Sequence, residues 1–140
     1  MKVFIDSDII VDVFSSDPRR LPFKVLSAVV MSLIERGHFT GISSPIVLSN
    51  AHYLLKKNDA VISELLEYIH AVPVNHEMLE EAFSSDHTDK EDAIQYLAAK
   101  KGRAKYFITR NIRHHTASVG IKVLTPADFV RLPSVRKILK

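Results

Sequence analysis

Short apolar runs alternate with amphipathic stretches along the whole of this 140-residue chain, and this alternation limits the possible folds more than any other feature. Strands that are separated by helices pair in parallel through right-handed crossovers. The sequence therefore predicts a single α/β domain over residues 1–140, in which helices cover both faces of an open parallel sheet. The expected strands cover residues 2–5, 39–43, 72–74, 104–109 and 121–124.

Capping residues and glycines mark the expected helices. Ser44 and Pro45 form an N-cap and a first helical position for a helix that continues to Lys57. Thr88 begins a capping-box pattern, and this predicts the start of a helix that Gly102 ends. The other expected helices cover residues 21–36, 59–69 with Asp59 as the N-cap, 78–83, and a terminal segment that begins at Thr125.

The composition excludes several kinds of protein. The chain has no cysteine, so disulfides, thiolate zinc sites and a cysteine nucleophile are ruled out. Asp6 and Asp8 interrupt the first apolar run too early for a signal peptide or a membrane span, and we therefore expect a cytoplasmic protein. The net charge is +3 and basic residues gather toward the C-terminus, which fits a polyanionic partner but also a mildly basic domain that binds no nucleic acid.

The segment VFIDSDIIVDVF, residues 3–14, places three aspartates among residues that are apolar except for Ser7. A buried carboxylate is costly unless it is paired. Asp6 directly follows the first strand, so we expect it at the carboxyl edge of the sheet, where open α/β folds bind their ligands. Asp12 is expected to face solvent. A purely structural alternative is that Ser7 or Asp8 caps the following helix.

Two later segments bring further oxygen atoms to the same edge of the predicted sheet. Asp92 lies in the first turn of a helix, Asp89 lies on nearly the same face, and Asn111 follows the strand at 104–109. Carboxylate and amide oxygens suit a hard cation such as Mg²⁺ or Mn²⁺. The helix dipole also favours acidic residues in a first turn, so simple capping is the alternative explanation for Asp89 and Asp92.

Taken together, the segments FIDSDIIVDVF, SPIVLSNAHYLLKK, SDHTDKEDAIQYLAAKKGRAKYFITRN and TPADF resemble a PIN domain, and the similarity covers nearly the whole chain. The resemblance implies a three-layer α/β/α fold with a central parallel sheet of four to five strands. It places the family's first metal-binding aspartate at Asp6, the small hydroxyl residue after it at Ser7, and the third acidic position at Asp92. The acidic or amide position after the fourth strand falls at Asn111.

The loop before Asp92 also matches the family, since Asp86 and Asp89 fit a recurrent pattern there. Two positions depart from it. Asn50 stands where a glutamate is usual, although a similar PIN subgroup also carries asparagine, and the alternative for Asn50 is a buried amide that the backbone satisfies. His114 replaces an aspartate that is common after the TRN motif, and the alternative for this histidine is a solvated turn.

The resemblance implies that the chain hydrolyses RNA and that it is the toxin of a toxin–antitoxin pair. It also implies that an antitoxin or a second copy of the chain covers the apolar stripe of residues 21–36, and we expect a dimer in solution. Asp6 and Asp92 are expected to bind Mg²⁺ or Mn²⁺, while Asn111 and Asp89 hold water molecules around the ion. The residues expected to bind the RNA substrate are Ser7, Asn50, Arg110 and Arg113.

Two other functions remain open. A degenerate PIN domain would bind RNA or a protein partner without cleaving it, as the loss of carboxylates at Asn50 and His114 allows. Asp6-Ser7-Asp8 resembles the DxD motif of a phosphatase of the haloacid dehalogenase type. That motif is followed two residues later by Thr or Val, whereas this chain has Ile10 there, and the chain is short for that fold.

Overall fold

The computed structural model describes residues 1–112 and 120–140, and its centre is an all-parallel sheet of five strands in the order β3-β2-β1-β4-β5. β1 is the middle strand, and Val3 pairs with Gly41 on one side and with Tyr106 on the other. The strands are β1 (Lys2–Ile5), β2 (Thr40–Ser43), β3 (Ile69–Ala71), β4 (Tyr106–Ile108) and β5 (Lys122–Leu124). The predicted parallel α/β sheet is therefore confirmed.

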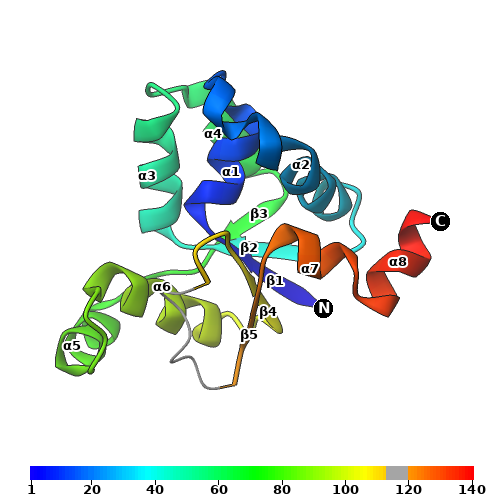
Figure 1. Ribbon diagram of the computed structural model, residues 1–140. Helices are drawn as coiled ribbons and strands as arrows, with labels where there is room; N and C mark the ends of the chain where they lie inside the picture. Colours follow the sequence, from blue (N-terminus) through cyan, green and yellow to red (C-terminus); the bar gives the residue numbers. More distant parts are fainter. Residues whose placement is uncertain (113–119) are drawn as a thin grey trace.

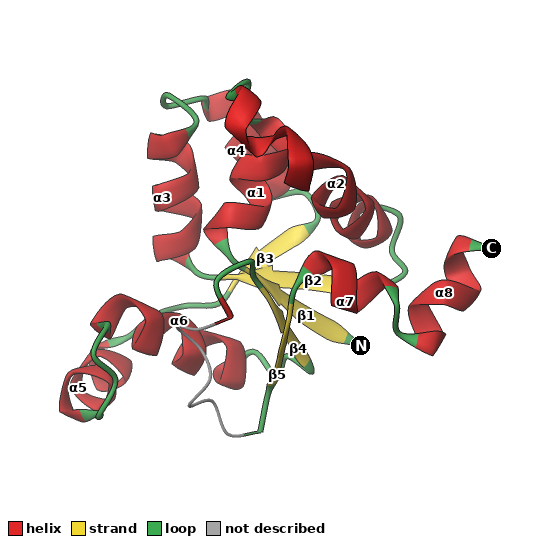
Figure 2. Ribbon diagram, viewed as in Figure 1, coloured by secondary structure: helices red, strands yellow, loops and turns green. Residues whose placement is uncertain are grey.

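Helices lie on both faces of this sheet, which gives the three-layer α/β/α arrangement (Figures 1 and 2). On one face lie α1 (Ser7–Phe14), α2 (Leu21–Glu35), α3 (Pro45–Leu54) and α4 (Asp59–Leu65), and on the other lie α5 (His76–Ser84) and α6 (Lys90–Lys101). A 3₁₀ turn at Pro18–Arg20 precedes α2, and α7 (Pro126–Val130) and α8 (Pro133–Leu139) end the chain. None of the helices described is long and apolar enough to cross a membrane.

The central strands form the core because their side chains are covered from both sides. Val3, Phe4 and Ile5 of β1 are completely buried, as the continuous apolar run predicts for a strand with helices on both faces. Phe4 stacks on Phe107 of β4 with 4.7 Å between ring centroids. This packing fixes the relative positions of the residues that follow β1 and β4.

Three predicted boundaries on the β3 side of the sheet are wrong. α4 ends at Leu65 rather than at residue 69. α3 ends at Leu54 rather than at Lys57, because the backbone of Lys56 and Lys57 is left-handed, with φ of 58° at both residues. The edge strand is Ile69–Ala71 rather than 72–74, and Pro73 explains the shift because it has no N–H to donate to a ladder.

The caps of α4 and α6 also differ from expectation by one residue. Asn58, not Asp59, caps α4, and its side-chain oxygen accepts a hydrogen bond from the N–H of Val61 at 3.3 Å. Asp89, not Thr88, caps α6. The sequence pattern predicted the start of α7 correctly, and Thr125 caps this helix, but the pattern did not separate α8 from α7.

Candidate active site

Asp6 is held at the carboxyl end of β1 by contacts on both sides. Its N–H donates to the carbonyl oxygen of Ile108 at 3.1 Å, which extends the pairing of β1 with β4. Its Oδ1 accepts from the N–H of Ser7 at 2.8 Å and so caps α1, while the hydroxyl of Thr109 lies 2.8 Å from its Oδ2. The carboxylate is therefore fixed at the predicted edge of the sheet, beside the segment that follows β4.

Asp8 lies in the first turn of α1 and is less well compensated. Its Oδ2 accepts from the backbone N–H of Arg110 at 2.9 Å and lies 3.3 Å from the hydroxyl of Thr109. Its buried Oδ1 has no hydrogen-bond partner among the residues that the structure describes. Burial and then the neighbouring charge of Asp6 raise the pKa of Asp8 to about 6. Negative charge is thus in excess where β1 ends.

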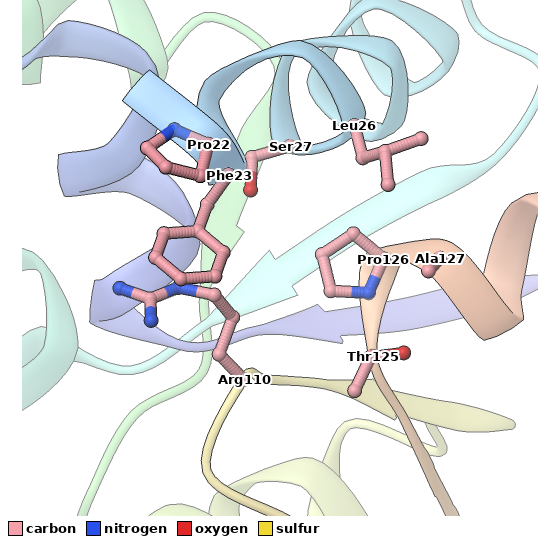
Figure 3. Close-up of a pocket in the computed structure, with 8 residues that line it drawn as sticks. All are labelled: Pro22, Phe23, Leu26, Ser27, Arg110, Thr125, Pro126 and Ala127. Atoms are coloured by element: carbon pink, nitrogen blue, oxygen red, sulfur yellow. The ribbon is translucent and has the colours of Figure 1, made fainter. Parts of the chain in front are cut away.

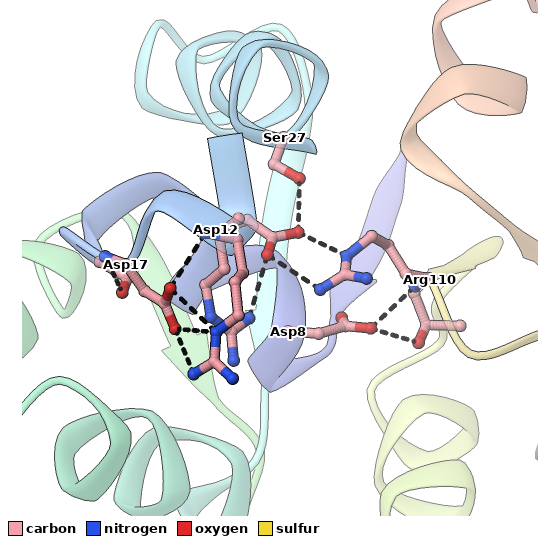
Figure 4. A network of polar contacts seen from close by, with 9 residues as sticks. Asp8, Asp12, Asp17, Ser27 and Arg110 are labelled. Carbon is pink, nitrogen blue, oxygen red and sulfur yellow. Dashed lines mark hydrogen bonds and ion pairs between the residues drawn. The ribbon is translucent and has the colours of Figure 1, made fainter. Parts of the chain in front are cut away.

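Asp12 does not face solvent, contrary to expectation, but is completely buried. It lies one turn after Asp8 on the same face of α1, and that face contacts the segment after β4 (Figure 4). Its two carboxylate oxygens accept from Nε and Nη2 of Arg110 at 2.6 and 3.0 Å, and Nη1 of Arg20 lies 3.0 Å away. The guanidinium of Arg110, expected to bind phosphates, is therefore directed into the protein.

The first half of α6 contacts α3 and the residue that caps α3. Asn50 of α3 donates from Nδ2 to a carboxylate oxygen of Glu91 at 2.6 Å, so this half-buried amide is satisfied by a side chain rather than by the backbone. The hydroxyl of Ser44 donates to the side-chain oxygen of Gln95. These contacts bring the first turn of α6, with the half-buried Asp92, to the side of the sheet where β2 ends.

Asp89 uses its side chain to cap α6, because Oδ1 accepts from the N–H of Asp92 at 3.1 Å. The capping explanation of Asp89 is therefore confirmed, and its expected role in holding water is not tested. Asn111 is exposed, and its N–H donates to Oγ1 of Thr109 at 3.1 Å. Arg113 and His114 lie outside the described residues.

Sequence reasoning missed Thr109, which is completely buried and contacts both Asp6 and Asp8. It also missed the pairing of Asp12 with Arg110. A signal for that pairing exists in the sequence, because Asp8 and Asp12 are spaced for one helix face that is otherwise apolar, and an arginine follows the neighbouring strand.

The donor set fits a hard cation that keeps most of its water. Mg²⁺ is commonly bound through one or two carboxylates, several waters and phosphate oxygens of the substrate. Oδ1 of Asp8 is buried without a hydrogen-bond partner, and Asp6 and Asp8 repel each other. The basic side chains of the described residues therefore do not fully balance the negative charge at this place. Over residues 1–112 and 120–140 no three His, Cys, Asp or Glu side chains form a metal-binding group, so a dry cage of protein ligands is not present there.

A five-stranded parallel sheet with aspartates where β1 ends and α6 begins is the arrangement that the PIN resemblance implies. The profile of the PIN domain family matches residues 2–113, so the chain belongs to the PIN domain family. It is 29% identical over 138 residues to Ribonuclease VapC1 of Aquifex aeolicus (strain VF5), and the alignment covers 91% of this chain and 92% of that protein.

The fold is also similar to a chain in the crystal structure of VapBC2 from Rickettsia felis bound to a DNA fragment from their promoter. The TM-score is 0.61 at 16% sequence identity, and the match covers 89% of this chain and 98% of that chain. At this identity the likeness supports the fold alone.

Proposed function

We propose that this protein is a metal-dependent endoribonuclease and the toxin of a toxin–antitoxin pair. Membership of the PIN family and the similarity to a protein named Ribonuclease VapC1 support the reaction class. The observation that carries the proposal is the uncompensated charge where β1 ends, with Asp6 fixed by Thr109 and Asp8 left with a buried oxygen that no described residue satisfies. A bound cation would balance this negative charge, which the described side chains balance only in part.

In this proposal Asp6 and Asp92 would hold Mg²⁺ or Mn²⁺. When bound, the ion lowers the pKa of water and neutralises charge that builds on the scissile phosphate. Thr109 orients Asp6 by its hydrogen bond, and Asn111 and Asp89 hold water near the site. Ser7 and Asn50 face the RNA, and the basic residues toward the C-terminus attract its backbone without choosing a sequence.

The test replaces Asp6 with asparagine. Asn is as good an N-cap as Asp, so Asp6→Asn keeps the cap of α1 and should fold. We expect the loss of metal-dependent RNA cleavage and weaker Mn²⁺ binding in calorimetric titration. Asp17→Asn is a matched control, because Asp17 also caps a helical turn but pairs with the exposed Arg19. Cleavage at the wild-type rate by purified Asp6→Asn protein would refute the proposed nuclease site, in which Asp6 is the principal metal ligand.

A degenerate PIN domain that binds RNA or protein without cleavage is the second candidate. It is favoured by Asn50, which supplies an amide where the family usually has a carboxylate, and which is engaged with Glu91. Binding of RNA with no Mn²⁺ affinity at millimolar metal would support this candidate. Activity on a phosphomonoester would instead support the phosphatase reading.

The outer face of α2 is where we expect a protein partner. Leu21 and Val25 are 60% and 71% exposed there, and Leu139 of α8 adds to the same apolar region. The VapBC2 assembly of the structural relative supports an antitoxin as one partner. A homodimer is the other expectation, and light scattering of the purified chain at tens of micromolar distinguishes a dimer from a monomer.

A further inference from the structure

The strongest contact that the proposed nuclease site does not use is the one between Asp12 and Arg110. Nε and Nη2 of Arg110 bind the two oxygens of a carboxylate that has no exposed surface, in the bidentate geometry that makes such pairs strong and directional. The ring of Phe23 lies against the guanidinium, with 3.9 Å from its central carbon to the ring centroid (Figure 3). The guanidinium is thus fixed in position and in plane.

α1 holds Arg110 at both ends. Asp8 accepts the backbone N–H of Arg110, and Asp12, one turn later, accepts its guanidinium. The residues on either side of Arg110 belong to the site: Thr109 contacts Asp6, and Asn111 donates its N–H to Thr109. Any movement of Arg110 along α1 therefore moves the hydroxyl that orients Asp6.

Arg20 gives the internal comparison. It binds the same carboxylate at 3.0 Å, and its side chain is 26% exposed, as is that of Arg110. Arg20 is only 8 residues from Asp12 and lies in the turn before α2, whereas Arg110 is 98 residues away and lies beside the site. The two arginines thus have similar environments, but only one of them joins α1 to the segment that follows β4.

From this we infer that Arg110 is a positioning residue: anchored on Asp12 and Phe23, it holds residues 109–111 against α1 and thereby orients Asp6 through Thr109. The inference rests in part on the proposed nuclease function, which it deepens. It also assigns Arg110 a role different from phosphate binding. A bidentate phosphate contact needs a free edge of the guanidinium, and here the edge formed by Nε and Nη2 is occupied by a buried carboxylate.

The experiment compares Arg110→Met with Arg20→Met in the full chain. Each variant leaves Asp12 paired with the other arginine and with Ser27, so we expect both to fold, which thermal unfolding checks. The main measurement is hydrogen exchange of the backbone amides of residues 110 and 111, resolved by NMR without metal or RNA. Arg110→Met should raise exchange at both amides about tenfold or more, and Arg20→Met should leave them within about twofold of wild type.

Equal exchange at these two amides in both variants overturns the inference. If Arg110→Met does not fold, Arg110→Lys replaces it, because lysine keeps the charge but cannot make the paired bonds or stack flat on Phe23. Faster exchange at residues 110 and 111 in Arg110→Lys then supports the anchor, and wild-type exchange overturns it.

Kinetics give the second readout if the chain cleaves RNA. A positioning role predicts that Arg110→Met lowers kcat about 10- to 100-fold with little change in KM, because misplacement of a reacting group acts on the chemical step. A raised KM with unchanged kcat would mean that Arg110 binds phosphate, and would overturn the inference. If neither the wild-type protein nor any variant cleaves RNA, the proposed function fails. The exchange experiment still decides whether Arg110 holds residues 109–111 against α1.

Discussion

Asp8 and Asp12 lie one turn apart on the same face of α1, yet the protein pairs the charge of Asp12 and leaves that of Asp8 incompletely paired. Asp12 has two guanidinium groups and a hydroxyl around it, and its charge is more than balanced. Asp8 has one backbone N–H and a shared hydroxyl, beside the charge of Asp6. A buried carboxylate whose shell the protein completes, such as Asp12, has a structural role, whereas one whose shell is left incomplete, such as Asp8, is a candidate for contact with a cation.

Removal of the compensated carboxylate should have the largest effect. Asp12→Ala leaves Arg20 and Arg110 as partly buried cations without their shared partner, and we expect the free energy of unfolding to fall by about 3 kcal/mol. Urea denaturation monitored by circular dichroism measures the change. Asp59→Ala is the control, because Asp59 is 91% exposed and its contact with His52 should contribute less than about 1 kcal/mol. Equal losses in the two variants would contradict the contrast between paired and exposed carboxylates.

Neutralising the uncompensated carboxylate of Asp8 should raise the free energy of unfolding, whereas removal of Asp12 should lower it. Asp8→Asn removes the repulsion with Asp6 and keeps an oxygen for the N–H of Arg110, so at pH 7.5 in EDTA we expect the free energy of unfolding to rise by about 1 to 2 kcal/mol. Because burial and Asp6 raise the folded-state pKa of Asp8 from 3.8 to about 6, the folded wild type binds more protons than the unfolded chain between these values. Wild-type stability therefore falls, for this group, as pH rises from about 4 to about 6.

The pH series makes the Asp8 prediction specific. The stability difference between Asp8→Asn and wild type should grow between about pH 4 and pH 6 and stay constant above that range. A difference that does not change over this window would mean that Asp8 is as well compensated in the folded protein as in water, and the contrast with Asp12 would be lost.

The smallest effect is expected at Thr109, the hydroxyl between the two environments. Thr109→Val keeps the shape of the side chain but removes the donor to Asp6 and the acceptor for the N–H of Asn111. We expect a loss of about 1 kcal/mol in the free energy of unfolding. Thr109→Ser keeps the hydroxyl and is the matched control. If the valine variant is as stable as the serine variant, the hydroxyl does not bind Asp6 in solution.

The sequence predicted the parts of this molecule that depend on local pattern. The apolar run at 2–5 predicted a central strand, and Gly102 marked the end of α6. Asp6 was placed correctly at the carboxyl edge because a residue that follows a parallel strand has no other place to lie. The predicted β3 was three residues too late in the chain, because Ile69 continues a helical apolar spacing but pairs with Gly41 in the folded sheet.

The ion pair of Asp12 could not be predicted from local pattern, because its partner is 98 residues away. A helix wheel places Asp12 beside Asp8, but only the packing of the segment after β4 on α1 decides whether that face meets water or an arginine. The same holds for Asn50, whose partner Glu91 comes from a different helix. Sites of this kind require the tertiary fold.

The contacts between Asp6 and Thr109, and between Asp12 and Arg110, join residues 103 and 98 positions apart. Contacts of such long sequence separation form late, because the chain between them must be ordered before they can compensate for its lost entropy. On the ribosome, the start of α1 is synthesised first and can make these contacts only after β4 and the residues that follow it have been synthesised. The geometry of Asp6 is therefore completed only after most of the chain has been synthesised, so the order of synthesis itself keeps a nascent chain from having an assembled site.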